Sequence, residues 1–139
     1  AKAAEGDLIK ALKQFGSVSK VDNSIVLVLP ESLWTGSRTS TLTILADGKM
    51  SSLGEILANN PDYAVTIESH TDGAAPADVA QSLTDSRANL IAEKFKFLGV
   101  PESRIRARGF GGQIPAVPNT TARNRAKNRR VNVILDLTL

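Results

Sequence analysis

The residue types that most often carry out catalysis or bind metals are missing or scarce in this sequence. Its 139 residues include no cysteine and one histidine, His70, and aromatic residues make up 4%. Without cysteine there is no disulfide framework and no thiolate chemistry, which is compatible with either the cytoplasm or the periplasm. A single histidine cannot supply the ligands of a zinc site, and no nucleophile elbow is present for a catalytic triad. We therefore expect no metal, no cofactor and no catalytic role for His70.

Long hydrophobic runs are also absent. No stretch approaches the roughly 18 consecutive apolar residues that a membrane-spanning helix needs, and no signal peptide is visible. We expect contact with a membrane only through parts of the parent protein that lie outside this sequence. The length suits one domain with a substantial core, and the apolar content of 42% is ordinary for a globular protein. The net charge of +3 favours an acidic partner only weakly.

The spacing of the apolar residues predicts helices and strands in alternation. The predicted helices cover residues 5–15, 46–59, 82–98 and, as one or two turns, 121–127. The predicted strands cover residues 18–21, 25–29, 63–69, 105–110 and 129–137. The connection from 63 to 110 is long enough to join a parallel pair of strands. The expected fold class is α/β (α+β), with a mixed sheet and helices packed on one face. Residues 1–24, a helix and a first strand, lead into a domain formed by 25–139.

The segment from Ser69 to Ala88 is the one around which the chain is organised. Asp72 comes directly after the predicted strand, and ligands tend to bind at the carboxyl ends of strands in such sheets. Arg87 falls on the apolar side of the following helix, for which Ser82 is the expected N-cap of a capping box. A guanidinium in that position needs an anionic or polar partner, and Asp72 is the nearest candidate. A purely structural ion pair between the two remains an open alternative.

A basic segment near the end of the chain, residues 123–130, contains five cations in eight residues. It could bind nucleic-acid phosphates, form a solvated basic face or recognise carboxylates, for which arginine is well suited. The alternation of the last strand places Arg129 on the side of the apolar residues and Arg130 on the opposite side. Arg129 is therefore the better candidate for a pocket.

Several spaced motifs occur here in the order in which they occur in a known family. They are His70-Thr-Asp72, Leu83-Thr84, Arg87-Ala88, a later Gly-x-Gly with a proline, Asn119-Thr-Thr121 and Asn128-Arg-Arg-Val131. From about Ile25 to Leu135 the chain resembles the OmpA-like C-terminal domain. The resemblance implies a β/α/β/α/β sandwich that binds peptidoglycan without cleaving it. It implies a binding module rather than an enzyme, in the periplasm of a diderm bacterium, anchoring the parent protein or the outer membrane to the cell wall.

The same resemblance implies the ligand and the residues that bind it. The ligand would be the diaminopimelate of the stem peptide, whose end carries an ammonium and a carboxylate. Asp72 would bind the ammonium, Arg87 the carboxylate, and Arg129 would add a contact to the peptide. The ligand-binding pocket would be completed by Thr71, Ala80 and Leu83. An aromatic residue of the family fills the core where this chain has Trp34.

Two other functions stay open at this point. One is a basic nucleic-acid-binding module, which we do not favour, because aromatic residues are too few for a base-stacking platform. The other is an OmpA-like assembly domain that has lost its ligand. Departures from the family pattern favour this last alternative: Ser69 replaces a glycine, Arg123 and Asn124 replace Glu-Gly, and Ala80 replaces an asparagine that helps to hold diaminopimelate.

Overall fold

The elements alternate along the chain as the sequence predicts. A computed structural model describes residues 2–138. In chain order the elements are α1 (Lys2–Leu12), β1 (Ser17–Val21), β2 (Ser24–Leu29), the 3-10 turn η1 (Glu31–Leu33), α2 (Ile44–Ala58), β3 (Tyr63–His70), α3 (Ala77–Phe97), the 3-10 turn η2 (Glu102–Arg104), β4 (Ile105–Gly109), α4 (Ala122–Asn128) and β5 (Arg130–Leu137).

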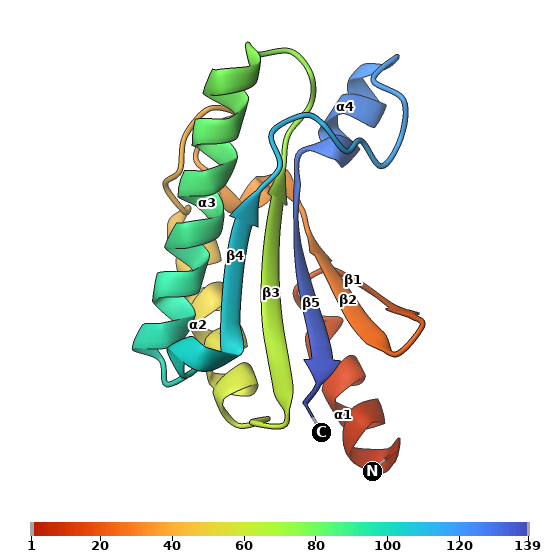
Figure 1. Cartoon of the computed structure of the whole chain (residues 1–139), viewed down its shortest axis with the longest axis vertical. Helices are drawn as coiled ribbons and strands as arrows, with labels where there is room; N and C mark the ends of the chain where they lie inside the picture. Colours follow the sequence, from red (N-terminus) through yellow and green to blue (C-terminus); the bar gives the residue numbers. More distant parts are fainter. Residues whose placement is uncertain (1, 139) are drawn as a thin grey trace.

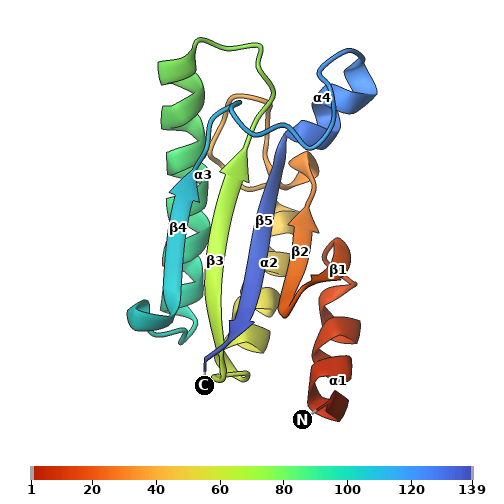
Figure 2. The same cartoon turned by 45° about the vertical axis from the view of Figure 1, so that its right-hand side comes forward.

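The five strands form one mixed sheet in the order β1-β2-β5-β3-β4. Only β3 and β4 are parallel, and α3 makes the crossover between them, as expected for this connection. Helices α2 and α3 lie on the same side of the sheet (Figures 1 and 2). The predicted fold class is therefore confirmed. The carboxyl ends of β2, β3 and β4 and the amino end of β5 meet at the top of Figure 1.

The core lies between the sheet and the helices. Leu27, Val133 and Ile67 are register partners on three adjacent strands, and all three are fully buried on the helix-covered face. Trp34 is buried in the same core, which confirms its expected role. Leu12 of α1 also belongs to it, and β1 pairs with β2, so α1 and β1 are packed against the rest of the domain. The domain boundary at residue 25 stays a prediction.

The start of α3 corrects one prediction. The helix begins at Ala77 after Pro76, five residues before the expected N-cap Ser82. Asp78 in the first turn favours this earlier start, because a carboxylate there interacts well with the helix dipole. The polar residues after Ser82 contact another element instead. The Thr84 hydroxyl accepts from Gly111 N–H at 2.9 Å, and the Asp85 carboxylate accepts from Gly109 N–H at 3.1 Å.

The other face of the sheet carries His70. Its ring is 3% exposed and stacks on Phe110, with ring centroids 5.0 Å apart and planes 6° from parallel. The stack holds the ring in place, and Nδ1 has no hydrogen-bond partner among the described residues. Burial, together with the nearby positive charge of Arg130, lowers the pKa of His70 to about 4. The ring is therefore neutral at pH 7.

Gly109 allows β4 to approach α3 closely. A methyl group at Gly109 would lie 2.4 Å from Asp85 N and 2.5 Å from Thr84 Oγ1. We expect Gly109→Ala to lower the free energy of unfolding by about 1–3 kcal/mol or more, because the helix has to move away. Gly48→Ala in α2 is the matched control, since nothing lies within 4 Å of the added methyl group. That change should raise stability by about 0.5–1 kcal/mol. Urea unfolding of both variants measures these changes in stability. Equal changes in the free energy of unfolding would contradict the close approach of β4 to α3.

The low pKa of His70 makes stability depend on pH. Its folded-state pKa of about 4 lies below the ordinary histidine value of 6.5. The unfolded chain therefore binds more protons than the folded chain between these values, and stability falls as the pH drops from 6.5 to 4. The expected loss is about 3 kcal/mol, at about 1.4 kcal/mol per pKa unit. His70→Phe keeps the stacking and should flatten this part of the stability profile. An NMR titration of the histidine ring with a midpoint near 6.5 would refute the expectation.

Candidate functional site

A small cavity lies where the loop after β3 meets the first turns of α3. Its volume is about 130 Å³. It is lined by five of the predicted site residues, Thr71, Asp72, Ala80, Leu83 and Arg129. Five residues that were not predicted also line it, and Arg38 is the charged one among them. The sixth predicted residue, Arg87, does not line it. The sequence-based site is thus largely assembled in one place, from three separate segments of the chain.

Asp72 is the acidic group of this cavity and is only 7% exposed. Its Oδ1 accepts a hydrogen bond from Ala74 N–H at 3.0 Å, and Arg129 NH1 donates to its Oδ2 at 2.5 Å. Burial by itself would raise the pKa of Asp72, but these two hydrogen bonds and the positive charge of Arg129 outweigh it and lower the pKa. Asp72 is therefore ionised at neutral pH and offers negative charge to a ligand.

Arg129 links Asp72 to a second carboxylate that the sequence did not single out. Its Nε donates to Glu31 Oε2 at 2.5 Å and its NH2 donates to Glu31 Oε1 at 3.1 Å. Hydrogen bonds to Glu31 are the main reason why the pKa of Arg129 is raised further above its usual range; burial opposes them, and Asp72 adds to them. Arg129 directly precedes β5, and its side chain reaches the pocket as the strand alternation predicted.

The expected contact between Arg87 and Asp72 does not form, and this corrects the sequence-based model. Arg87 is 2% exposed and donates from Nε to the carbonyl of Thr39 at 2.8 Å and from NH2 to the carbonyl of Gly36 at 3.0 Å. Its guanidinium also lies 4.8 Å from the centre of the Trp34 ring. Burial lowers the pKa of Arg87 to about 10. The loop after η1 is closer to Arg87 than the Asp72 loop and satisfies its donors with backbone carbonyls.

The remaining predicted residues shape the walls of the cavity. The Thr71 N–H donates to the Gly111 carbonyl at 3.0 Å, which anchors the loop that carries Asp72. Ala80 is buried in the first turn of α3, and Leu83 is half-buried one turn later. Gln81 does not replace the missing family asparagine, because its amide donates to the Gly109 carbonyl at 2.7 Å. The side chain next to Ala80 therefore points towards β4, not into the cavity.

Sequence reasoning missed three residues of the site region. Glu31 directly follows Pro30 at the end of β2, and the order β2-β5-β3 places that strand end beside Arg129. Arg38 lies on a loop without periodicity and gave no signal. Asn128 is fully buried and accepts from the N–H groups of Ala116 and Val117 at 2.8 and 3.1 Å. Its place at the start of the Asn-Arg-Arg-Val motif is the signal that could have identified it.

The five cations of the basic segment do not form one patch. Arg123 and Lys127 are exposed, whereas Arg129 is directed to the cavity. Arg130 lies on the opposite face, where it donates to the carbonyls of Asn128 and Ile114 at 3.3 Å. This divergence argues against a continuous phosphate-binding surface.

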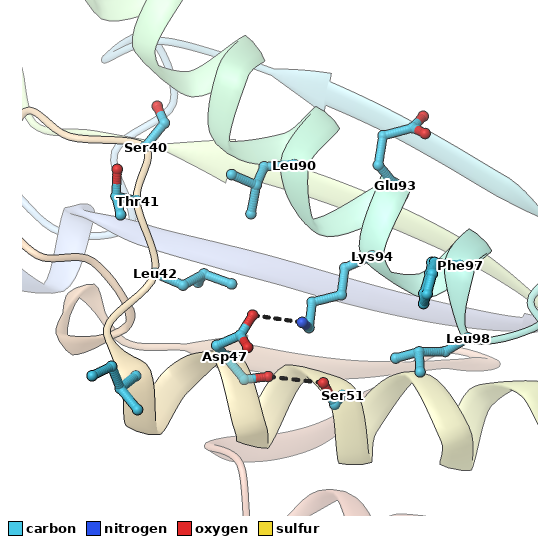
Figure 3. A pocket seen from close by; sticks show the side chains of 11 residues that line it. Ser40, Thr41, Leu42, Asp47, Ser51, Leu90, Glu93, Lys94, Phe97 and Leu98 are labelled. Carbon is cyan, nitrogen blue, oxygen red and sulfur yellow. Dashed lines mark hydrogen bonds and ion pairs between the residues drawn. The ribbon is translucent and has the colours of Figure 1, made fainter.

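A larger hollow of about 700 Å³ lies on the outer side of α2 and α3 and includes none of the predicted site residues. Figure 3 shows the Asp47 carboxylate and the Lys94 ammonium pointing towards each other across it, at 2.5 Å. Lys94 therefore reaches a surface partner instead of being buried. Ile44 and Phe97, which are 96% and 86% exposed, line the same hollow.

Within residues 2–138, no group of three or more histidine, aspartate or glutamate side chains is arranged to hold a metal ion. Across the same range, none of the helices has the length and apolar character required to span a membrane.

Comparison with known proteins identifies the family. A model of the OmpA family matches residues 37–129. The probable lipoprotein YiaD of Escherichia coli (strain K12) is 31% identical over 119 residues, which are 86% of this chain and 54% of YiaD. The peptidoglycan-binding protein ArfA of Mycobacterium tuberculosis (strain ATCC 25618 / H37Rv) is 34% identical over 76 residues, which are 55% of this chain and 23% of ArfA. The chain thus spans about half of YiaD and less than a quarter of ArfA.

Solved structures show the same fold. A putative MotB like protein from Desulfovibrio vulgaris has a TM-score of 0.80 at 23% identity, with 98% of this chain and 97% of that chain covered. The periplasmic domain of Helicobacter pylori MotB (residues 78–256) has a TM-score of 0.77 at 19% identity, with 88% and 82% covered.

The predicted localisation, as a domain of an outer-membrane or envelope protein, is confirmed at this level: the outer-membrane lipoprotein YfiB of Pseudomonas aeruginosa is 33% identical over 124 residues, which are 88% of this chain and 66% of YfiB. The family is non-enzymatic, which confirms that this chain is not an enzyme. With a family model that covers about two thirds of its length, the chain belongs to the OmpA family.

Proposed function

We propose that this chain binds peptidoglycan non-covalently through the diaminopimelate of the stem peptide, and so anchors its parent protein to the cell wall. Two findings support peptidoglycan as the polymer that is bound: the family to which the chain belongs, and the relative that is named a peptidoglycan-binding protein. The observation that carries the choice of ligand is the ionised, buried carboxylate of Asp72 in a small cavity with guanidinium groups around it. A pocket with both signs of charge suits a zwitterion.

The unoccupied lone-pair positions of the Asp72 carboxylate suit an ammonium group. A carboxylate has about four lone-pair positions, and Ala74 N–H and Arg129 each occupy one. The remaining positions can accept hydrogen bonds from a ligand ammonium. Because Asp72 is nearly buried, this contact is stronger than a surface ion pair, and the walls formed by Leu83 and Ala80 exclude water from it.

The cavity also argues against nucleic acid as the partner and against lysine in place of diaminopimelate. None of the residues that line the cavity is aromatic, so a nucleotide base would have no ring to stack on, and the ionised carboxylate of Asp72 repels a phosphate group. A lysine side chain would offer the ammonium without the carboxylate, and would leave the surrounding guanidinium groups without a ligand partner. The same polar groups that bind diaminopimelate therefore discriminate against lysine.

Replacing Asp72 should remove binding while the fold is kept. In Asp72→Asn, Arg129 retains Glu31 as its partner, so we expect a folded protein. Losing one partner of a nearly buried charge contact costs about 2–5 kcal/mol, which is an affinity loss of at least about 30-fold. Pull-down with isolated sacculi and calorimetry with a diaminopimelate muropeptide measure it. Arg130→Ala, on the opposite face, is the matched control and should bind like the unmodified chain. A folded Asp72→Asn protein that still binds sacculi would reject the proposal.

Restoring the family asparagine should tighten binding. Ala80 borders the cavity and has no side-chain amide, and Gln81 is engaged with β4. One additional neutral hydrogen bond contributes about 0.5–1.5 kcal/mol, so Ala80→Asn should raise the affinity for diaminopimelate up to about tenfold. Calorimetry on the two proteins tests this. An unchanged affinity would mean that the ligand does not approach Ala80.

A further inference from the structure

Within residues 2–138, the three most exposed large apolar side chains lie on or beside one hollow. They are Ile44, Phe97 and Leu45, which are 96%, 86% and 71% exposed. Ile44 and Phe97 line the hollow of about 700 Å³ along α2 and α3, and Leu45 follows Ile44 in the first turn of α2. Single exposed apolar residues are common, but a cluster of them around a hollow marks a surface that another molecule covers.

The hollow itself is also largely apolar. Figure 3 shows Leu90 and Leu98 of α3 pointing towards α2, and Leu42, which precedes α2, lines the same space. At one end the two helices are in close contact, because a methyl group at Gly54 would lie 2.7 Å from Leu98 Cδ1. An apolar side chain that entered the hollow would therefore be surrounded mainly by leucine.

The two protruding side chains stand on either side of an ion pair. Helices α2 and α3 run in the same direction (Figure 1), and Asp47 of α2 pairs with Lys94 of α3. Ile44 lies about 4.5 Å before this pair along α2, and Phe97 about 4.5 Å after it along α3. The protrusions and the depression that could receive them are thus on the same face of the molecule.

The charges around the hollow are of both signs. Lys94 pairs with Asp47 at 2.5 Å, and Lys96 pairs with Glu93 at 3.1 Å. Because these two acidic and two basic groups balance, the hollow lacks the excess positive charge that would attract an anionic membrane surface or another polyanion. A surface that binds a second copy of itself needs both signs, because a twofold axis sets each residue against a different residue of the partner.

We infer that this α2–α3 face, formed by the residues that line the hollow, binds the same face of a second copy of the chain. The twofold axis lies in the face, between α2 and α3. Ile44 then packs against the partner's Phe97, and Asp47 lies opposite the partner's Lys94, and each contact occurs twice per dimer. Each copy supplies both the apolar protrusion and the hollow that receives it.

The size of the face predicts a weak dimer. Helix α2 has 15 residues and is about 22 Å long, and two helices side by side are about 20 Å wide. The contact buries on the order of 500 Å² of each copy, or about 1,000 Å² in total, which is typical of transient contacts. We expect a dissociation constant on the order of 100 μM. Parent proteins held at one surface would associate more readily, because their effective concentration is higher.

The α2–α3 face leaves the cavity around Asp72 open. Leu83, in the wall of that cavity, and Phe97 are about 21 Å apart along the axis of α3. A dimer therefore keeps both cavities accessible, and the inference does not depend on the ligand that they bind.

Sedimentation velocity of the whole chain, from about 5 to 500 μM, tests the inference. The unmodified chain should shift from monomer to dimer over this range. Phe97→Asp should raise the dissociation constant at least about tenfold and should keep the fold, because the side chain is exposed. Ile114→Asp adds the same charge at an exposed apolar residue outside the hollow, and as the matched control it should dimerise like the unmodified chain. Urea unfolding verifies that both variants are folded.

The opposite charges allow a test of the twofold geometry. Asp47→Lys and Lys94→Asp each place like charges against each other across the axis, so each variant alone should be monomeric. When the two variants are mixed in equal amounts, their faces are complementary, and a dimer with one copy of each should form.

Three results would overturn the inference. The first is an unmodified chain that stays monomeric at about 500 μM, and the second is a dimer that Phe97→Asp does not weaken. The third is a mixture of Asp47→Lys and Lys94→Asp that remains monomeric, since the face would then not pair with itself. Sedimentation of a monomeric unmodified chain with phosphatidylglycerol vesicles, lost in Phe97→Asp, would assign the face to a membrane instead.

Discussion

The arrangement of the site depends on one guanidinium held between two carboxylates. Arg129, which precedes β5, bonds to Glu31 after β2 and to Asp72 after β3. Three segments that are distant in sequence are joined by charges that are partly removed from water. Each of these charges would be unfavourable there alone, because desolvation is offset only when opposite charges and hydrogen bonds are in place. The same contact keeps Asp72 ionised, so structure and ligand recognition share one interaction.

The order of the strands makes this contact possible. Since β5 lies between β2 and β3, the carboxyl ends of β2 and β3 and the amino end of β5 meet at the same end of the sheet (Figure 1). Helix α3 forms the next wall of the cavity, and it can sit close to β4 because Gly109 has no side chain. Its Asp85 accepts a hydrogen bond from Gly109 at the end of β4, and its Thr84 accepts one from Gly111 in the loop that follows. The cavity is thus supported on several sides by regular elements, which limits how far its charged groups can move.

Much of the fold could be predicted from the sequence, because periodicity reports local structure and burial. The strands agree with the prediction to within one or two residues, as for β2 and β5, and α3 ends near Gly99 as expected. Five of the six predicted site residues line one cavity. The start of α3 was misplaced because Ser82 and Asp85 have the spacing of a capping box, yet the Asp85 carboxylate accepts from Gly109 N–H at the end of β4. The role of Glu31 was missed because a single glutamate after a proline has no distinguishing pattern.

By itself, the sequence determined the alternation of elements, the apolar face of the last strand and the opposite directions of Arg129 and Arg130. It also contained the spaced motifs that indicate the family. Only the tertiary structure decided which cation meets which anion. Arg87 bonds to residues 48 and 51 positions away, and Arg129 to residues 57 and 98 positions away. Such pairings follow from distance after the sheet and helices have packed, and a buried guanidinium can donate its hydrogen bonds to backbone carbonyls instead of to a carboxylate. Residue type and helix face therefore predict that Arg87 needs a partner, but cannot say which one it has.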